Sequence, residues 1–479
     1  MDRAPTPKRA RTGADERSEE TSGAPLGIAA PSSAANKPSA PSKASVQQLM
    51  RPYYGRLFPH AEFARWLAYG NDSKHLQADA GFFQRREFCF TMDGDIFIRY
   101  QSFKDAEELQ RAIQLKVPAK IDIGPVYNVD PQRRAAFQGL GTERAFQPME
   151  RELVFDIDLT DYDDVRTCGR EGHMCAACWP LMAVAVQVLD AGLRDDFGFE
   201  HILWVFSGRR GIHCWVCDAR ARQLTDEQRA AVAAYFSVYK GQEGGLARLA
   251  LSQVSASNHP ALDRAYDALH AAWVEHILPA QRPLDSDEGC EAVLAYLRGD
   301  EVAARLRARW SRGGARSGAL SIQRWEDLEA EIDKILEGKA ADGKARRAAL
   351  ARARKEIVFA HAYPRLDVEV SKKRNHLLKA PFCVHPKTGK VCVPLDPAAV
   401  WDFNPEEVAT VSQLLAELEA ADASIPKPAN GGGPGWERTA LAGAVETFRA
   451  CFLDALAAAD RQALGAKARE NAAAPTLAW

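Results

Sequence analysis

The sequence predicts a mixed α/β fold in which a helical segment interrupts a core that contains strands. Three observations lead to this prediction. Short runs rich in β-branched and aromatic residues occur at 152–158 and 204–217, and tight-turn sequences such as Asp93-Gly94 join neighbouring runs. From about 219 to 355 the composition changes to alanine, arginine, glutamate and leucine at helical spacing. Strand-like runs return between 363 and 394.

The expected segments follow in order along the 479 residues. They are a disordered tail (1–44), a first part of the core (45–218), a helical insertion (219–355), a second part of the core (356–425), and a linker with a terminal helix (426–479). The tail is rich in proline, alanine and serine and has no apolar periodicity. Its basic stretch at 7–11 is either a nuclear localisation patch or part of a solubilising charged tail.

The overall charge and hydropathy exclude some classes of protein. With 62 basic and 64 acidic residues, the formal net charge is −2, so any contact with DNA must come from a local basic patch. The arginine-rich stretch 305–316 is such a patch, but a solvated helix face is the preferred interpretation. No apolar run approaches the roughly 20 residues that span a bilayer, so no membrane role is expected.

The strand at 152–158 carries the most informative pair of residues. Asp156 and Asp158 are two positions apart, so their side chains point to the same face of the strand. Burying two such carboxylates unpaired costs on the order of several kcal/mol, and a divalent cation removes that cost. The pair therefore predicts a Mg²⁺ or Mn²⁺ site, which binds two ions if Asp367 joins it. A strand end with solvated acids is the alternative.

Cationic residues follow in two further blocks. A tight Ser-Gly-Arg-Arg-Gly turn at 207–211 lies between two strand-like runs, and a third block offers another strand, 363–370, that contains Asp367. Glycine lets the backbone approach an anion, and arginine contacts phosphate with two hydrogen bonds. A surface turn without a ligand is the alternative. The candidate nucleotide-binding residues are Ser207, Arg209, Arg210, His213, Lys379 and His385.

Together these blocks resemble the small, catalytic subunit of eukaryotic DNA primase, in the archaeo-eukaryotic primase superfamily. The similar blocks are 86–88, 98–103, 120–124, 152–164, 207–218 and 363–396. The resemblance implies the primase catalytic core, in which small mixed sheets are flanked by helices. It implies template-directed synthesis of RNA primers from ribonucleoside triphosphates on single-stranded DNA, by two-metal-ion nucleotidyl transfer. It also implies support roles near the cleft for Glu87, Arg99, Asp122 and Arg365.

The same resemblance implies partners and a location. The expected partners are the large regulatory subunit of primase, in a heterodimer, and DNA polymerase α, and the expected location is the nucleus. Two other functions stay open. One is a gap-filling or damage-tolerant primase-polymerase of the superfamily, and the other is a zinc-containing nucleic-acid-binding scaffold without catalysis.

A cysteine cluster follows the aspartate strand and predicts a structural zinc site. Members of the resembled family commonly carry a second cysteine next to the first, and this chain has Gly169 at that position. The expected ligands are Cys168, His173, Cys175 and Cys178. The histidine replaces the missing thiolate, because zinc accepts imidazole as readily. A distant cysteine, such as Cys89 or Cys383, or a water molecule is the alternative fourth ligand.

Overall fold

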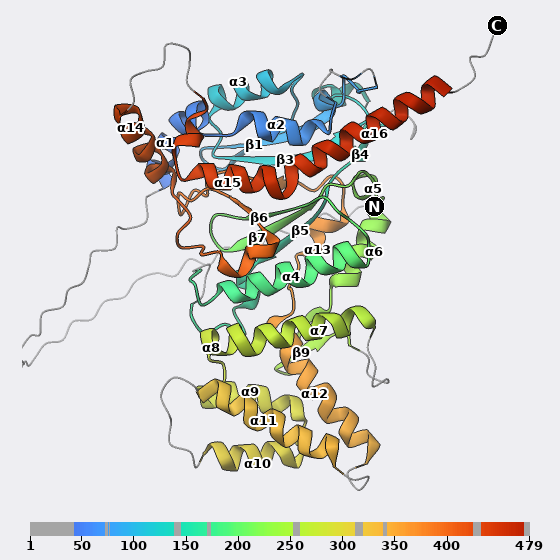
Figure 1. Ribbon diagram of the computed structural model, residues 1–479, viewed down its shortest axis with the longest axis vertical. Helices are drawn as coiled ribbons and strands as arrows, with labels where there is room; N and C mark the ends of the chain where they lie inside the picture. Colours follow the sequence, from blue (N-terminus) through green and yellow to red (C-terminus); the bar gives the residue numbers. More distant parts are fainter. Residues whose placement is uncertain are drawn as a thin grey trace, which may run out of the picture. The chain divides into compact units, whose positions relative to one another are not determined.

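The core of the protein contains two antiparallel sheets, and a third, two-stranded sheet lies within the predicted insertion (Figure 1). The computed structural model describes residues 43–71, 75, 77–137, 145–169, 174–251, 259–311, 320–338, 343–424 and 433–473. The strands are β1 (Arg86–Met92), β2 (Ile96–Gln101), β3 (Lys120–Tyr127), β4 (Pro148–Glu150), β5 (Leu153–Asp158), β6 (Ile202–Phe206), β7 (Gly211–Val216), β8 (Tyr239–Glu243), β9 (Leu246–Leu249), β10 (Leu378–Lys379) and β11 (Pro394–Leu395). The predicted mixed α/β fold is confirmed.

Helices cover the sheets and make up most of the insertion. Their bounds are α1 (Lys43–Arg56), α2 (His60–Ala68), α3 (Ala106–Lys116), α4 (Trp179–Asp195), α5 (Ala219–Arg222), α6 (Asp226–Phe236), α7 (Pro260–Ala272), α8 (Leu278–Gln281), α9 (Asp287–Leu294), α10 (Glu301–Trp310), α11 (Leu320–Glu337), α12 (Lys344–Ala362), α13 (Val368–Lys372), α14 (Val411–Ser424), α15 (Leu441–Phe448) and α16 (Asp454–Ala473). Among the described residues, no helix is long and apolar enough to cross a bilayer.

The first sheet has the strand order β10-β3-β1-β2, and β4 pairs with β3. The predicted hairpin is present, since Met92 pairs with Ile96 and Gly94 between them has a φ of 77°. On β1, Phe88 and Phe90 are fully buried and contact Phe103. Strand β2 is the edge of the sheet and is largely exposed.

The second sheet has the strand order β11-β6-β7-β5. Helix α4 packs against it because the apolar side of this helix is buried, and Trp179 at its start contacts Phe206 of β6. Elsewhere in the sheet, Trp215 of β7 meets Trp66 of α2, which also contacts Phe448 of α15. The C-terminal helical region thereby joins α2 and the second sheet in one core.

Two expectations about secondary structure are wrong. Residues 363–370 do not form a strand, because Asp367 caps α13 by accepting a hydrogen bond from the Glu369 amide at 3.1 Å. The insertion is not entirely helical, because β8 and β9 form a hairpin through Gly244 and Gly245, both at positive φ. These two strands are short and mostly polar, so they lack the apolar alternation that predicts a strand.

The arginines of the insertion are paired locally. Arg305 contacts Glu331 at 2.9 Å, and Arg307 contacts Glu291 at 2.7 Å. Arg309 contacts Asp327 at 3.0 Å. These ion pairs support the interpretation of residues 305–311 as a solvated helix face rather than a nucleic-acid contact. Residues 40–479 form one compact unit, and the division into core and insertion stays a prediction.

Candidate active site

Three aspartates lie near one another at one edge of the second sheet. Asp156 and Asp158 lie on β5, where their partners on β7 are His213 and Gly211. Asp367 follows the insertion in the sequence, and its backbone N–H donates to the Asp156 carbonyl at 3.1 Å. A second hydrogen bond, from the Ser371 hydroxyl to the Val154 carbonyl at 2.6 Å, fixes α13 along the same strand. The structure therefore brings the three predicted aspartates together.

The Asp158 carboxylate is oriented by its neighbours. One oxygen of Asp158 accepts from the amide and hydroxyl of Thr160, at 2.9 and 2.8 Å. Its other oxygen accepts from Arg210 Nε at 2.8 Å. The Nε2 atom of His213 lies 3.7 Å from Asp156. These contacts hold the acids in one region without neutralising all of their charge.

The carboxylates repel one another strongly. Burial, together with the charges of Asp158 and Asp367, raises the pKa of Asp156 to about 7. The pKa of Asp161, three residues after Asp158, is also raised by burial and by the same two neighbours. Such a site favours either a bound proton or a bound cation on Asp156.

Replacing Asp156 with asparagine is expected to stabilise the metal-free protein. The raised pKa of Asp156 means that its contribution to stability is present in acid and is lost as the pH rises through about 7. Since asparagine carries no charge, Asp156→Asn should raise the free energy of unfolding by about 1–3 kcal/mol near pH 8 and by clearly less near pH 5, because the loss accumulates between about pH 4 and pH 7. Urea unfolding in the presence of EDTA measures both values, with Asp93→Asn, on an exposed turn, as the control. An equal gain at both pH values would contradict this explanation.

The β6–β7 turn presents the predicted basic residues beside the acids. Ser207 and Gly211 close the turn with two hydrogen bonds, Ser207 N–H to the Gly211 carbonyl at 2.9 Å and Gly211 N–H to Ser207 Oγ at 3.0 Å. The ammonium group of Lys379 on β10 donates to the Ser207 carbonyl at 2.6 Å, which ties the first sheet to this turn. A Cβ on Gly208 would lie 3.0 Å from His385 Cβ, so glycine allows the His385 loop to approach.

Both predicted histidines are neutral near physiological pH. Burial and the nearby Lys379 lower the pKa of His213 to about 3. Burial, then Lys379 and Arg209, lower the pKa of His385 to about 3. The Lys387 amide donates to His385 Nδ1 at 3.2 Å, so Nε2 carries the proton of this neutral ring. These histidines can offer hydrogen bonds to an anion, while the positive charge comes from Arg209, Arg210 and Lys379.

The four predicted support residues fall into separate groups. Glu87 and Arg99 pair with each other on the first sheet at 2.9 Å. Asp122, opposite Lys379 on β3, pairs with Lys120 at 3.0 Å. Arg365 contacts the Asp164 carboxylate and the Asp161 carbonyl, beneath the loop that follows β5. The Arg365 guanidinium therefore supports that loop.

Comparison with known proteins supplies the decisive observation. The family model described as DNA primase small subunit matches residues 155–397, which contain all the predicted catalytic aspartates. The DNA primase small subunit of Schizosaccharomyces pombe is 42% identical over 376 residues, which cover 78% of each chain. The chain belongs to the DNA primase small-subunit family.

Other members of the DNA primase small-subunit family agree. The Drosophila melanogaster protein is 40% identical over 79% of this chain and 83% of its own length. The Saccharomyces cerevisiae protein is 35% identical over 77% of this chain and 85% of its own length. These relatives confirm the resemblance to eukaryotic primase and do not favour the two alternative functions. The polymerase domain of Mycobacterium tuberculosis ligase D aligns with a TM-score of only 0.30.

One residue near the site of this primase family member was not predicted. His376 is exposed, and its carbonyl accepts from Arg151 Nε at 3.3 Å. Burial of part of the ring lowers the pKa of His376, while the negative charge of Asp367 opposes this effect. His376 therefore lies within electrostatic range of the third carboxylate. Its place in the third sequence block was the only available signal.

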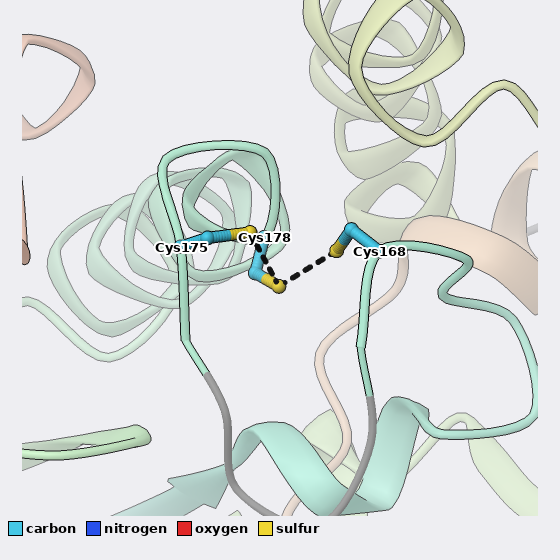
Figure 2. A group of neighbouring side chains, drawn as sticks. All are labelled: Cys168, Cys175 and Cys178. Carbon is cyan, nitrogen blue, oxygen red and sulfur yellow. Dashed lines mark hydrogen bonds between the residues drawn. The ribbon is translucent and has the colours of Figure 1, made fainter. Parts of the chain in front are cut away.

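The three predicted cysteines of this primase family member also meet (Figure 2). The Sγ atom of Cys178 lies 2.9 Å from that of Cys168 and 3.5 Å from that of Cys175. All three sulfur atoms lie within 4.8 Å of one another, so the group could hold a metal ion. The predicted fourth ligand, His173, lies outside the described residues.

Hydrogen-bond donors surround the cysteine group. Gln281 Nε2 donates to Cys168 Sγ at 3.1 Å, and Arg166 Nη1 donates to Cys178 Sγ at 3.5 Å. Burial is the larger influence and raises the pKa of Cys178 to about 12, while the hydrogen bond from Arg166 acts in the opposite direction. The alternative ligands Cys89 and Cys383 lie elsewhere, because Cys89 is on β1 and Cys383 donates to the Ile121 carbonyl of β3. Neither is part of the group found among the described residues.

Proposed function

We propose that this chain is the catalytic subunit of a DNA primase that makes short RNA primers from ribonucleoside triphosphates on single-stranded DNA. The convergence of Asp156, Asp158 and Asp367 beside Arg210 and Lys379 carries this proposal. The aspartates repel one another, and the neighbouring cationic side chains do not neutralise all of their negative charge. Such a site is suited to binding a triphosphate together with metal ions.

The three aspartates would hold two Mg²⁺ or Mn²⁺ ions. The fit rests on the chemistry of the site, because hard oxygen ligands suit these ions and because the pKa of Asp156 is raised to about 7 by burial and two neighbouring carboxylates. When bound, such ions lower the pKa of an attacking 3′-hydroxyl and offset the charge of the leaving pyrophosphate.

The residues of the chain would bind and orient the triphosphate. Arg210 already contacts Asp158 and can also meet a phosphate oxygen, so it would link the nucleotide to the acids. Lys379 and Arg209 supply further positive charge, while the Ser207 hydroxyl and the neutral His213 and His385 offer hydrogen bonds. Fixed donors of this kind hold the α-phosphate in line for attack without reorganising during the reaction.

We also propose partners and a location for this chain. The relatives are named small subunits, which supports a heterodimer with the large regulatory subunit of primase. We extend the proposal to association with DNA polymerase α, to a template and RNA primer as bound nucleic acids, and to action in the nucleus.

Nucleotide incorporation on a poly-dT template tests the proposed reaction. Wild-type protein with Mg²⁺ or Mn²⁺ should polymerise labelled ATP without a primer, and EDTA should stop it. A clear preference for dATP would instead favour a gap-filling polymerase of the superfamily. Binding of the template without any incorporation would favour a scaffold.

We also propose zinc at the cysteine group, with His173 as the fourth ligand. Purified protein should hold about one zinc per chain that Mg²⁺ does not displace, because thiolate and imidazole ligands disfavour hard cations. Cys175→Ser and His173→Ala should lower the zinc content, measured by elemental analysis, and should lower stability. Cys383→Ser is the control, because the thiol of Cys383 donates a hydrogen bond to the Ile121 carbonyl of β3. Full zinc retention in His173→Ala would exclude this ligand.

A further inference from the structure

A cluster of aromatic and arginine side chains on the first sheet has no part in the mechanism proposed above. The rings of Tyr127 and Phe146 stack with their centroids 4.0 Å apart and their planes 10° from parallel. Tyr127 is buried, whereas Phe146 is partly exposed, so the stack ends at the surface on Phe146. Tyr100 of β2 meets Phe146 edge-on, with centroids 6.0 Å apart.

A buried acid fixes this cluster in place. Glu87 is fully buried and accepts from the Tyr127 hydroxyl at 3.0 Å and from Arg99 Nε at 2.9 Å. It also accepts from the backbone N–H of Tyr100 at 3.2 Å. Tyr100 has a φ of 59°, a backbone conformation that residues other than glycine rarely adopt. The hydrogen bond that the Tyr100 N–H donates to Glu87 therefore holds a disfavoured backbone conformation, which directs the Tyr100 ring toward Phe146.

The cluster presents a positive charge. Arg134, exposed on a 3-10 helix at Pro131–Phe137, places its guanidinium carbon 4.2 Å from the centroid of the Tyr100 ring. Within the described part of the chain, Arg134 forms no ion pair, whereas the charge of Arg99 is taken up by Glu87. The face of Phe146 that points away from Tyr127, next to an arginine, is suited to stacking with a base and to contact with a phosphate backbone.

Arg99 of the first sheet links this cluster to the segment that follows Asp367. Arg99 Nη2 approaches the carbonyl of Asn375 at 3.5 Å, and the next residue, His376, lies within electrostatic range of Asp367. A template base that pairs with the incoming nucleotide has neighbours on its own strand, and those neighbours need a surface beside the acids. The contact between Arg99 and Asn375 connects the cluster to the chain segment that contains Asp367.

We propose that Phe146, Tyr100 and Arg134 form a platform on which a base of the single-stranded template stacks as the strand approaches the active site. This inference rests on the proposed function and adds the position of the template to it. The occupant is nucleic acid rather than protein, because the platform combines ring faces with a cation that has no acid partner among the described residues.

Binding of a fluorescein-labelled dT oligonucleotide to the full chain, followed by anisotropy, tests the platform. Phe146→Leu and Arg134→Gln should each weaken binding by about five- to a hundredfold, the range measured for stacking on a single base. Phe146→Trp should restore it. There are two matched controls. Phe97→Leu removes an exposed ring from β2, the edge strand that also carries Tyr100, and Arg133→Gln removes the exposed positive charge next to Arg134. Quenching of a 2-aminopurine base in the oligonucleotide reports stacking directly and should be lost in Phe146→Leu.

Several results would overturn the proposal. One is equal weakening in the controls, since that would indicate a general charge effect. Another is unchanged oligonucleotide affinity in Phe146→Leu and Arg134→Gln, whether or not those variants lose binding to the large regulatory subunit. The Asp367→Asn variant separates the two proposals, because it should still bind the oligonucleotide. If the platform variants behave as expected but wild-type protein incorporates no nucleotide, the platform stands and the proposed reaction is wrong.

Discussion

Replacing Asp367 with asparagine is expected to abolish primer synthesis while leaving the fold intact. The neutral amide lacks the negative charge that the proposed divalent cations need, so the rate of nucleotide incorporation should fall by at least about a thousandfold. Asparagine is as good a helix cap as aspartate, so α13 should keep its first turn. The backbone hydrogen bond from residue 367 to Asp156 does not depend on the side chain. Nucleotide incorporation and thermal unfolding measure the two effects.

Glu369→Gln is the matched control for this variant. Glu369 lies two residues further on and is exposed, and its carboxylate contacts Lys372 on the same helix at 2.6 Å. Its loss should leave incorporation near the wild-type rate. Because the aspartates act as a unit, Asp158→Asn should be as inactive as Asp367→Asn, and the double variant should be no worse. Activity in Asp367→Asn above about a tenth of the wild-type rate would contradict its role as a metal ligand.

Replacing Glu152 with glutamine is expected to destabilise the protein more than any surface change. Glu152 is fully buried, and its two oxygens accept from both terminal nitrogens of Arg86 at 2.9 Å. They also accept from Arg151 Nη1 at 2.6 Å and from the Tyr69 hydroxyl at 2.7 Å. Removing one charge leaves two buried arginines uncompensated, which costs about 3–5 kcal/mol. Urea unfolding gives this value.

The effect should depend on pH in a defined direction. Burial raises the pKa of Glu152, but the charges of Arg86 and Arg151 outweigh it and hold the pKa well below its ordinary value. The stability that Glu152 provides is therefore fully present above its ordinary pKa and is lost progressively as the pH falls below that value toward the folded-state pKa. Glu150→Gln is the control, since Glu150 is partly exposed and pairs with Arg222 at 3.0 Å. An equally small loss in both variants would show that Arg86 and Arg151 are compensated by other groups.

Local sequence patterns predicted the parts of the site that depend on local geometry. The alternation of strand side chains placed Asp156 and Asp158 on one face, and the glycine-bounded turn placed Arg210 beside them. The cysteine spacing predicted a group whose sulfur atoms do meet. In each case the relevant residues are close in the sequence, so the alternation of side chains along a strand, or the geometry of a single turn, determines how they are arranged.

Longer-range features were not visible in the same way. The Val-Glu-Val sequence after Asp367 alternates as a strand does, but the side chain of Asp367 caps a helix that packs on β5 instead. The role of Glu152 depends on Arg86 from the other sheet, which no local pattern reveals. The proximity of His376 to Asp367 arises from the turn after α13 and could not be read from spacing.

The hydrogen bond from the Asp367 amide to the Asp156 carbonyl has a consequence for biosynthesis. The ribosome releases Asp156 and Asp158 first, and the whole helical insertion must follow before Asp367 emerges. A nascent chain therefore carries two repelling acids without the third, so the proposed site for two metal ions is still incomplete. Catalytic competence appears only when the returning segment docks beside β5. Synthesis of the insertion therefore places a delay between the synthesis of β5 and the completion of the active site.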